Sequence, residues 1–329
     1  MRWLLFIHNN PVPLESGYLL VEAPFLFASI LCTMIRMYSY FLLDSDELFN
    51  TQVAQWKQKG ITSLGMDFEG EFNLHIYGEH LCLIQLYDET SFFIADPFNL
   101  SPAVMKSFME DSSLEKIMFD CSSDASLMRK QYQIQLENVY DIRIPAMALD
   151  YMGNLSGLME MYHLPHDEGD KKKNQMTNWL TRPLQERQVQ YALGDVANLF
   201  NLKKILQQEI ADKHLISVVK DRMKGCAKQK NPEKAGWEKF PSYRYLTKEQ
   251  KIYLKHFFIA RDNIARKYNV PAVQVLEKQN LLVLAKDIPT DENSLRRLLP
   301  RISNEMLEAL LQAKVTASQE LVAVKPRSF

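Results

Sequence analysis

The sequence predicts a mixed α/β domain followed by a smaller all-α domain. Strand and helix signals alternate from about residue 38 to residue 205, which is the pattern of a sheet covered by helices. An antiparallel meander early in this stretch makes the predicted sheet mixed rather than purely parallel. After a charged segment that contains Pro232, Gly236 and Pro241, only helix signals follow. At 329 residues the chain is long enough for both domains.

The predicted strands of the first domain are short apolar runs. They cover Tyr38–Leu43, Ile61–Asp67, Leu81–Tyr87, Ser91–Ala95, Lys116–Phe119 and Asn138–Tyr140. Helices are expected at 44–59, from Ser101-Pro102 onward, and at 123–130, 142–152, 155–162 and 184–209. In the second domain, Thr247 and Gln250 form a capping-box pattern at the start of a helix. Further helices are expected near 271–278, 280–286, 291–299 and 303–313.

These signals divide the chain into five parts. Residues 1–36 are an uncertain N-terminal extension, for which a start codon assigned too far upstream is one explanation. Residues 37–227 form the α/β domain, 228–243 a linker, 244–315 the helical domain and 316–329 a tail. The apolar run after Pro24 is too short to span a bilayer, so we expect no membrane association.

Charge and cysteine content narrow the class of protein. From Arg244 onward there are 15 Lys and Arg against 9 Asp and Glu, whereas the rest of the chain is acidic. This asymmetry fits a metal-binding core beside a module that binds polyanions, and it also fits a solvated lysine-rich surface. The four cysteines form no CxxC pair, which argues against a structural zinc site and indicates thiols in a reducing compartment. We therefore expect a cytoplasmic protein.

Four carboxylates and a tyrosine carry the predicted chemistry. Asp67 and Glu69 lie two apart at the end of a predicted strand and so share a face. Asp124 begins a predicted helix, and Tyr191 and Asp195 lie one helical turn apart. Carboxylates repel one another, so a fold that gathers them indicates divalent cations, and paired cations suit phosphodiester hydrolysis.

Each assignment has an alternative at this point. Glu71 competes with Glu69, and Asp120 competes with Asp124, which is also a plausible helix cap. A core tyrosine beside a solvent-facing aspartate would give the Tyr191 spacing without any catalytic role.

Three longer motifs contain these residues. They are Met66-Asp67-Phe68-Glu69, the segment from Lys116 to Asp124, and Asn178-Trp179-Leu180-Thr181-Arg182-Pro183-Leu184 followed by Tyr191-Ala-Leu-Gly-Asp195. The chain resembles the RNase D family, in the tyrosine (DEDDy) subclass of the DEDD (DnaQ-like) 3′–5′ exonuclease superfamily. Its helical domain resembles the HRDC module of that family. The resemblance covers about residues 38–315 and implies an RNase H-like exonuclease domain followed by an HRDC-like domain.

The resemblance also implies roles for particular residues. Asp67, Glu69, Asp124 and Asp195 would bind two divalent cations, Mg²⁺ or Mn²⁺, and Tyr191 would orient the attacking water or help to deprotonate it. Substrate contacts are implied for Lys172, Phe68, Trp179 and Arg182, and a structural role for Asp141. Two departures stand out: the spacing after Glu69 is one residue longer than expected, which indicates a bulge, and Phe119 replaces a common histidine.

The expected function is trimming of RNA 3′ ends, with tRNA precursors as the substrate that the resemblance implies. A 3′–5′ DNA exonuclease is the alternative within enzymes, and a non-catalytic nucleic-acid-binding adaptor is the alternative of another class. No GxxxxGK[ST] loop occurs, which argues against a motor. Protein partners are not predicted.

Overall fold

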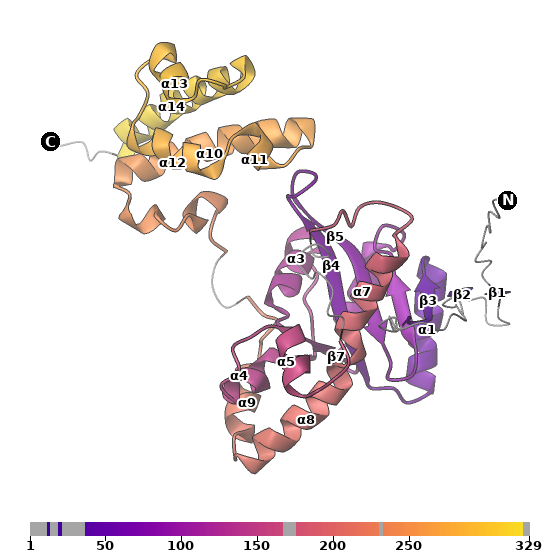
Figure 1. The fold of residues 1–329 in the computed structure, drawn as a ribbon. Coiled ribbons are helices and arrows are strands. Elements are labelled where there is room, and N and C mark those ends of the chain that lie inside the picture. Colours follow the sequence, from indigo (N-terminus) through magenta and orange to yellow (C-terminus); the bar gives the residue numbers. More distant parts are fainter. Residues whose placement is uncertain (1–11, 14–18, 22–36, 167–175, 230–232, 325–329) are drawn as a thin grey trace, which may run out of the picture. The chain divides into compact units, whose positions relative to one another are not determined.

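The computed structural model describes residues 12–13, 19–21, 37–166, 176–229 and 233–324. The chain divides into two compact units, and Figure 1 labels their elements. The first unit runs to residue 229 without residues 72–79, and the second contains residues 72–79 and everything from residue 230. No helix among the described residues combines the length and the apolar character needed to cross a membrane.

The described part of the first unit contains one mixed sheet of eight strands in the order β1-β2-β3-β6-β5-β4-β7-β8. The strands are β1 Val12–Pro13, β2 Leu19–Val21, β3 Tyr40–Leu43, β4 Ser63–Phe72, β5 Glu79–Tyr87, β6 Phe92–Ala95, β7 Glu115–Met118 and β8 Val139–Asp141. Strand β5 pairs antiparallel with β6, whereas β7 pairs parallel with both β4 and β8. The predicted meander and the mixed sheet are therefore confirmed.

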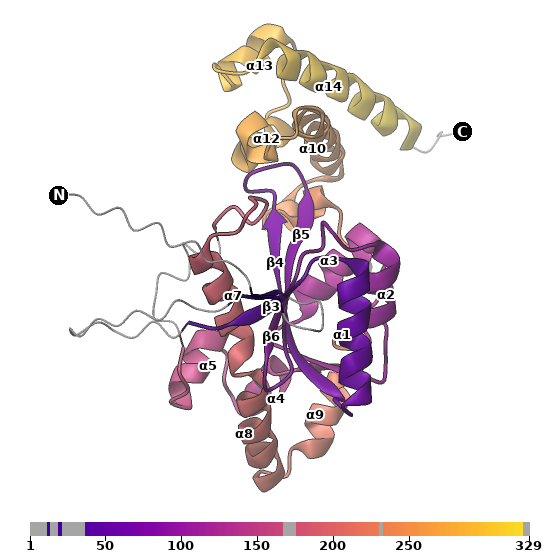
Figure 2. The same cartoon turned by 90° about the vertical axis from the view of Figure 1, so that its right-hand side faces the viewer.

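Helices cover both faces of this sheet. They are α1 Asp46–Gln58, α2 Pro102–Met109, α3 Ser122–Tyr132, α4 Arg143–Ala148, α5 Leu155–Met161, α7 Glu186–Ala197, α8 Leu199–Asp212 and α9 Ile216–Met223. Figure 2 shows α1 and α2 on one side of the sheet and α5 and α7 on the other. Tyr191 and Asp195, which belong to α7, are thus held by a helix that packs directly on the central strands.

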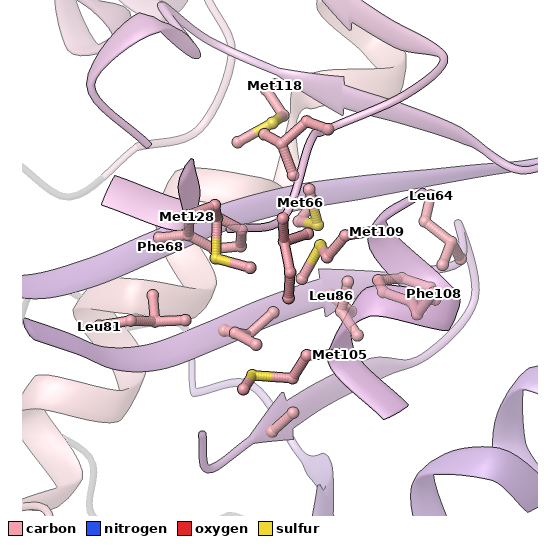
Figure 3. Packing of buried hydrophobic residues seen from close by; sticks show 14 of the residues in the cluster. Leu64, Met66, Phe68, Leu81, Leu86, Met105, Phe108, Met109, Met118 and Met128 are labelled. Carbon is pink, nitrogen blue, oxygen red and sulfur yellow. The ribbon is translucent and has the colours of Figure 1, made fainter. Parts of the chain in front are cut away.

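The larger core lies between the sheet and helices α1, α2 and α3. Alternate residues in the first part of β4 point into it, namely Leu64, Met66 and Phe68, and methionines from α2 and α3 pack between them (Figure 3). The intervening residues of β4 therefore face α7, because side chains alternate along a strand.

The second unit is helical apart from the hairpin segment 72–79. Its described elements are η1 Gly236–Lys239, η2 Tyr243–Tyr245, α10 Lys248–Tyr268, α11 Ala272–Val275, α12 Lys278–Lys286, α13 Glu292–Leu298 and α14 Asn304–Val324. Thr247 caps α10 through the predicted capping box with Gln250. The predicted all-α domain is confirmed, and its HRDC character stays a prediction.

Several element boundaries differ from the prediction. Asp67 and Glu69 lie inside a strand that continues to Phe72, not at its end. The single helix expected over 184–209 breaks at Asn198, whose buried side chain donates to the Pro165 carbonyl at 2.6 Å. Helix α9 was not expected.

The boundaries of the second unit are also wider than predicted. Phe240, which the sequence assigns to a linker, is buried in the core of the helical unit. Helix α14 continues to Val324, so most of the expected tail is helical. Ala317 and Leu321 pack against this core, which explains why the helix does not end near residue 313.

Candidate functional site

Strand β4 places Asp67 and Glu69 on the face that α7 covers. Their neighbours Met66 and Phe68 are buried in the core on the opposite face. Gly65, on the α7 face, lets the helix approach closely, since a Cβ at this position would lie 3.3 Å from the Val196 carbonyl oxygen. Alternation along β4 and a small residue at the contact therefore bring the two carboxylates beneath α7.

Helix α7 supplies the other half of the site. The Gln188 side chain accepts a hydrogen bond from the Gln185 backbone N–H at 2.9 Å, which stabilises the first turn of the helix. Tyr191 and Asp195 follow within the helix, at positions i and i+4, and so lie on one face of it. The helical spacing that the sequence predicts for this pair is confirmed.

Three carboxylates converge where β4 meets α7. Ligand oxygens of Asp67, Glu69 and Asp195 all lie within 4.8 Å of one another. Within the described ranges no other set of three potential metal ligands meets this criterion. Carboxylate oxygens are the ligands that Mg²⁺ and other hard divalent cations prefer, so the donor set fits such an ion.

The phenol of Tyr191 lies against this cluster. The residue is only 7% exposed. Burial raises the pKa of its phenol well above the ordinary value, and the charges of Asp195, Glu69 and Asp67 raise it further. The phenol is also hydrogen-bonded to Asp195. Tyr191 is therefore a neutral hydrogen-bonding group at physiological pH.

Asp124 does not join the group of three. It lies in the first turn of α3, as the sequence predicts, and its side chain is half-buried. Burial raises the pKa of its carboxyl to about 7, and the charges of Asp120 and Asp141 add to this effect. Of the four expected ligands three converge, and Asp124 lies apart from them on α3, the helix that follows β7.

Asp141 fixes the turn that precedes Asp124. Its buried carboxylate accepts backbone hydrogen bonds from Asp120 at 2.8 Å, Cys121 at 3.2 Å and Arg143 at 3.0 Å. Asp120 itself pairs with the Arg143 guanidinium at 2.6 Å. These contacts give Asp141 the structural role that the resemblance implies and engage Asp120 away from the cluster.

The geometry also separates Glu69 from Glu71. The charge of Glu69 acts on the Tyr191 phenol, whereas Glu71 lies beside Cys82. Cys82 and Leu83 both belong to the core under α7, while Leu81 and Ile84 belong to the opposite core. This break in alternation is the pattern of a bulge, as the longer spacing indicates.

The fold and the acidic cluster match a known family. A model of the 3′–5′ exonuclease domain matches residues 41–211, about half of the chain. The chain belongs to this family.

Individual relatives agree with this assignment. Ribonuclease D of Haemophilus influenzae is 26% identical over 278 residues, which cover 80% of this chain and 68% of that protein. Ribonuclease D of a Shewanella species is 30% identical over 177 residues, or 53% of this chain and 44% of that protein. These relatives confirm the resemblance to the RNase D family.

Solved structures share the fold. The crystal structure of Escherichia coli RNase D, an exoribonuclease involved in structured RNA processing, superposes with a TM-score of 0.68 at 22% identity, covering 85% of this chain and 75% of that one. The catalytic core of RRP6 from Trypanosoma brucei superposes with a TM-score of 0.66 at 17% identity, covering 97% and 96%. The predicted α/β exonuclease fold is thus confirmed.

The residues predicted to contact substrate are mostly engaged within the exonuclease unit. Phe68 is 7% exposed and belongs to the core on the far side of β4. Trp179 is 1% exposed and packs against Tyr191, with ring centroids 6.4 Å apart. Direct substrate contact is therefore not the role that their positions favour. Lys172 lies outside the described residues.

The Arg182 guanidinium makes several hydrogen bonds within the protein. Its guanidinium makes a two-point contact with Asp96, at 2.6 and 3.1 Å. It also donates to the carbonyl oxygens of Cys82 at 2.6 Å and Trp179 at 2.8 Å. These bonds anchor the segment before α7 to Cys82 of β5 and to Asp96, the residue after β6. They favour a role of Arg182 in supporting α7, and its contact with substrate stays a prediction.

The sequence analysis assigns no role to two residues near the site. Asp96 directly follows β6 and is the partner of Arg182, but an acidic residue after a strand carries no specific signal. Gln85 is a fully buried glutamine in the middle of β5. A polar residue within an apolar strand is the one sequence signal that could have found it.

Proposed function

We propose that this chain trims the 3′ ends of tRNA precursors and other RNAs, with two Mg²⁺ or Mn²⁺ ions as cofactors. It is a 3′–5′ exoribonuclease that releases nucleoside 5′-monophosphates. The observation that carries this conclusion is the convergence of Asp67, Glu69 and Asp195 within 4.8 Å, next to the buried phenol of Tyr191, on an exonuclease fold. The relatives named Ribonuclease D support RNA as the substrate.

The carboxylates would hold the cations. Asp67, Glu69 and Asp195 form one oxygen-rich group, and Asp124, in the first turn of α3, is the further ligand that we propose. Bound divalent cations would make water a stronger nucleophile and stabilise the leaving 3′ oxygen. The apolar packing around Tyr191 limits the access of bulk water, which strengthens electrostatic interactions in the site.

Tyr191 positions the nucleophile. Its neutral phenol can donate one hydrogen bond and accept another, which suits holding a water in line with the scissile bond. A phenol is protonated at neutral pH, and a protonated phenol can orient a water but cannot take a proton from it. Of the two roles that the resemblance implies for Tyr191, orientation is therefore the one that we propose.

The test is time-resolved digestion of a 5′-labelled single-stranded RNA with Mg²⁺ and with EDTA. We expect a ladder of products shortened one nucleotide at a time, only with Mg²⁺. Asp195→Asn should abolish the ladder, whereas Asp212→Asn, an exposed aspartate at the end of α8, should leave it unchanged. Cleavage inside the RNA, or a full ladder in EDTA, would contradict the proposal.

The same assay separates the alternatives. Equal or faster digestion of a matched DNA oligonucleotide would indicate a DNA exonuclease instead. Binding of RNA without release of mononucleotides under any metal would indicate an adaptor. The group of three intact carboxylates argues against an adaptor, because a protein that only binds RNA gains nothing from clustered negative charge.

The helical unit is proposed to bind the RNA backbone. From Arg244 onward its sequence has 15 Lys and Arg against 9 Asp and Glu. Contacts of lysine and arginine with phosphates tolerate any sequence and weaken as salt rises. RNA affinity that does not fall between about 50 and 200 mM salt would contradict this part of the proposal.

A further inference from the structure

Gln85 is a buried amide whose polar atoms are unpaired within the part of the chain that the structure describes. It lies in the middle of β5 and is 0% exposed. Neither its Nε2 nor its Oε1 atom has a hydrogen-bond partner among the described residues. Burying an amide in this state destabilises a fold, and natural cores rarely contain one. The destabilisation caused by burying this amide therefore indicates that Gln85 has a function.

The pairing of β4 with β5 places Gln85 beside Asp67. A Cβ on Gly65 would lie 3.6 Å from the Cβ of Tyr87, so these two residues face each other directly across the strands. In an antiparallel pair, two residues further along β4 oppose two residues back along β5, which puts Asp67 opposite Gln85. The bulge at Cys82–Leu83 lies outside this stretch and leaves the register unchanged.

Both side chains point to the α7 side of the sheet. Met66 and Leu86, the neighbours of Asp67 and Gln85 along their strands, point into the opposite core (Figure 3). On its other side, Gln85 pairs with Ile94 of β6, which offers no polar group. Of its two cross-strand neighbours, only Asp67 can accept a hydrogen bond from the amide.

We propose that Gln85 is a positioning residue that holds the Asp67 carboxylate in the orientation that binds a divalent cation. This inference rests on the proposed function. One carboxylate oxygen can face the cation while the other accepts a hydrogen bond from the Gln85 Nε2, directly or through one water. An amide suits this task because it donates a hydrogen bond without changing the charge of the cluster.

The test compares metal affinity with stability in Gln85→Met, which keeps the length of the side chain and removes its polar atoms. Calorimetric titration with Mn²⁺ should show affinity weakened about tenfold or more. In EDTA the melting temperature should be equal to or above that of the unsubstituted protein, because an unpartnered amide has been removed. Gln52→Met, at another buried glutamine on α1, should leave the Mn²⁺ affinity unchanged.

Unchanged Mn²⁺ affinity in Gln85→Met would overturn the inference. A lower melting temperature in EDTA with unchanged affinity would assign the amide a purely structural role. If Gln85→Met does not fold, the side-chain ¹⁵NH₂ signal of Gln85 in the unsubstituted protein gives the answer, since it should shift on addition of Mg²⁺, and a static signal would overturn the inference. A protein that binds no Mn²⁺ even with Gln85 intact would instead refute the proposed function.

Discussion

The contact of Arg182 with Asp96 offers a sharp test of how the site is supported. The Arg182 Nε and Nη2 atoms lie 2.6 and 3.1 Å from the two carboxylate oxygens of Asp96, whose side chain is 12% exposed. The same guanidinium donates to the carbonyl oxygens of Cys82 and Trp179. Arg182→Met would remove all of these bonds and leave the Asp96 charge buried without its partner.

The expected loss of stability follows from this burial. Removing one partner of a buried ion pair costs 3–5 kcal/mol, and because the Arg182 side chain is 29% exposed we expect about 3 kcal/mol. Urea unfolding followed by tryptophan fluorescence would measure it. A double-mutant cycle with Asp96→Asn should give a coupling energy of about 2 kcal/mol. Arg187→Met, at an exposed arginine of α7, is the matched control.

The result also decides between two roles of Arg182. If it supports α7, the variant loses stability while the KM for RNA stays near that of the unsubstituted protein well below its melting temperature. A variant that loses less than about 1 kcal/mol but shows a large rise in KM would refute the reasoning and restore Arg182 as a substrate contact.

Three further predictions follow from the structure. Burial lowers the pKa of Lys116 from 10.5 to about 8. Between these pH values the unfolded chain holds a proton on Lys116 that the folded chain has lost, so the free energy of unfolding should rise with pH. Relative to Lys116→Met, urea unfolding should show a rise of at most about 1.4 kcal/mol per pH unit. Parallel pH profiles of the two proteins would contradict this. The melting temperature should be higher with Mg²⁺ than with EDTA, because the cation relieves repulsion in the carboxylate cluster, and Asp67→Asn should lose this difference. An equal difference in Asp67→Asn and in the unsubstituted protein would place the ion elsewhere. Tyr191→Phe should lower kcat about 100-fold and leave the Mn²⁺ affinity unchanged, because the phenol orients water rather than binding metal. Single-turnover digestion measures the rate and calorimetry measures the affinity. A loss of Mn²⁺ affinity would make Tyr191 a ligand.

Local periodicity made much of the site predictable. Asp67 and Glu69 lie two apart on a strand, and Tyr191 and Asp195 lie four apart on a helix, so each pair shares a face in any fold that contains these elements. Sequence order and motif spacing then indicated that the two pairs converge. The structure agrees for these residues because regular elements fix side-chain directions.

Features that depend on tertiary packing were not predictable in the same way. The position of Asp124 depends on the turn before α3, which is stabilised by the carboxylate of Asp141 at the end of β8. The role of Arg182 depends on Asp96, which lies 86 positions earlier in the chain. The break in the helix at Asn198 depends on the Pro165 carbonyl. None of these partners leaves a periodic signal in the sequence.

Anomalous diffraction from crystals soaked in Mn²⁺ tests the central claim most directly. The account predicts anomalous peaks about 2 Å from carboxylate oxygens of Asp67, Glu69 and Asp195, and their loss in crystals of Asp195→Asn. Mn²⁺ bound only at other sites, or no peak at these carboxylates at millimolar Mn²⁺, would contradict it.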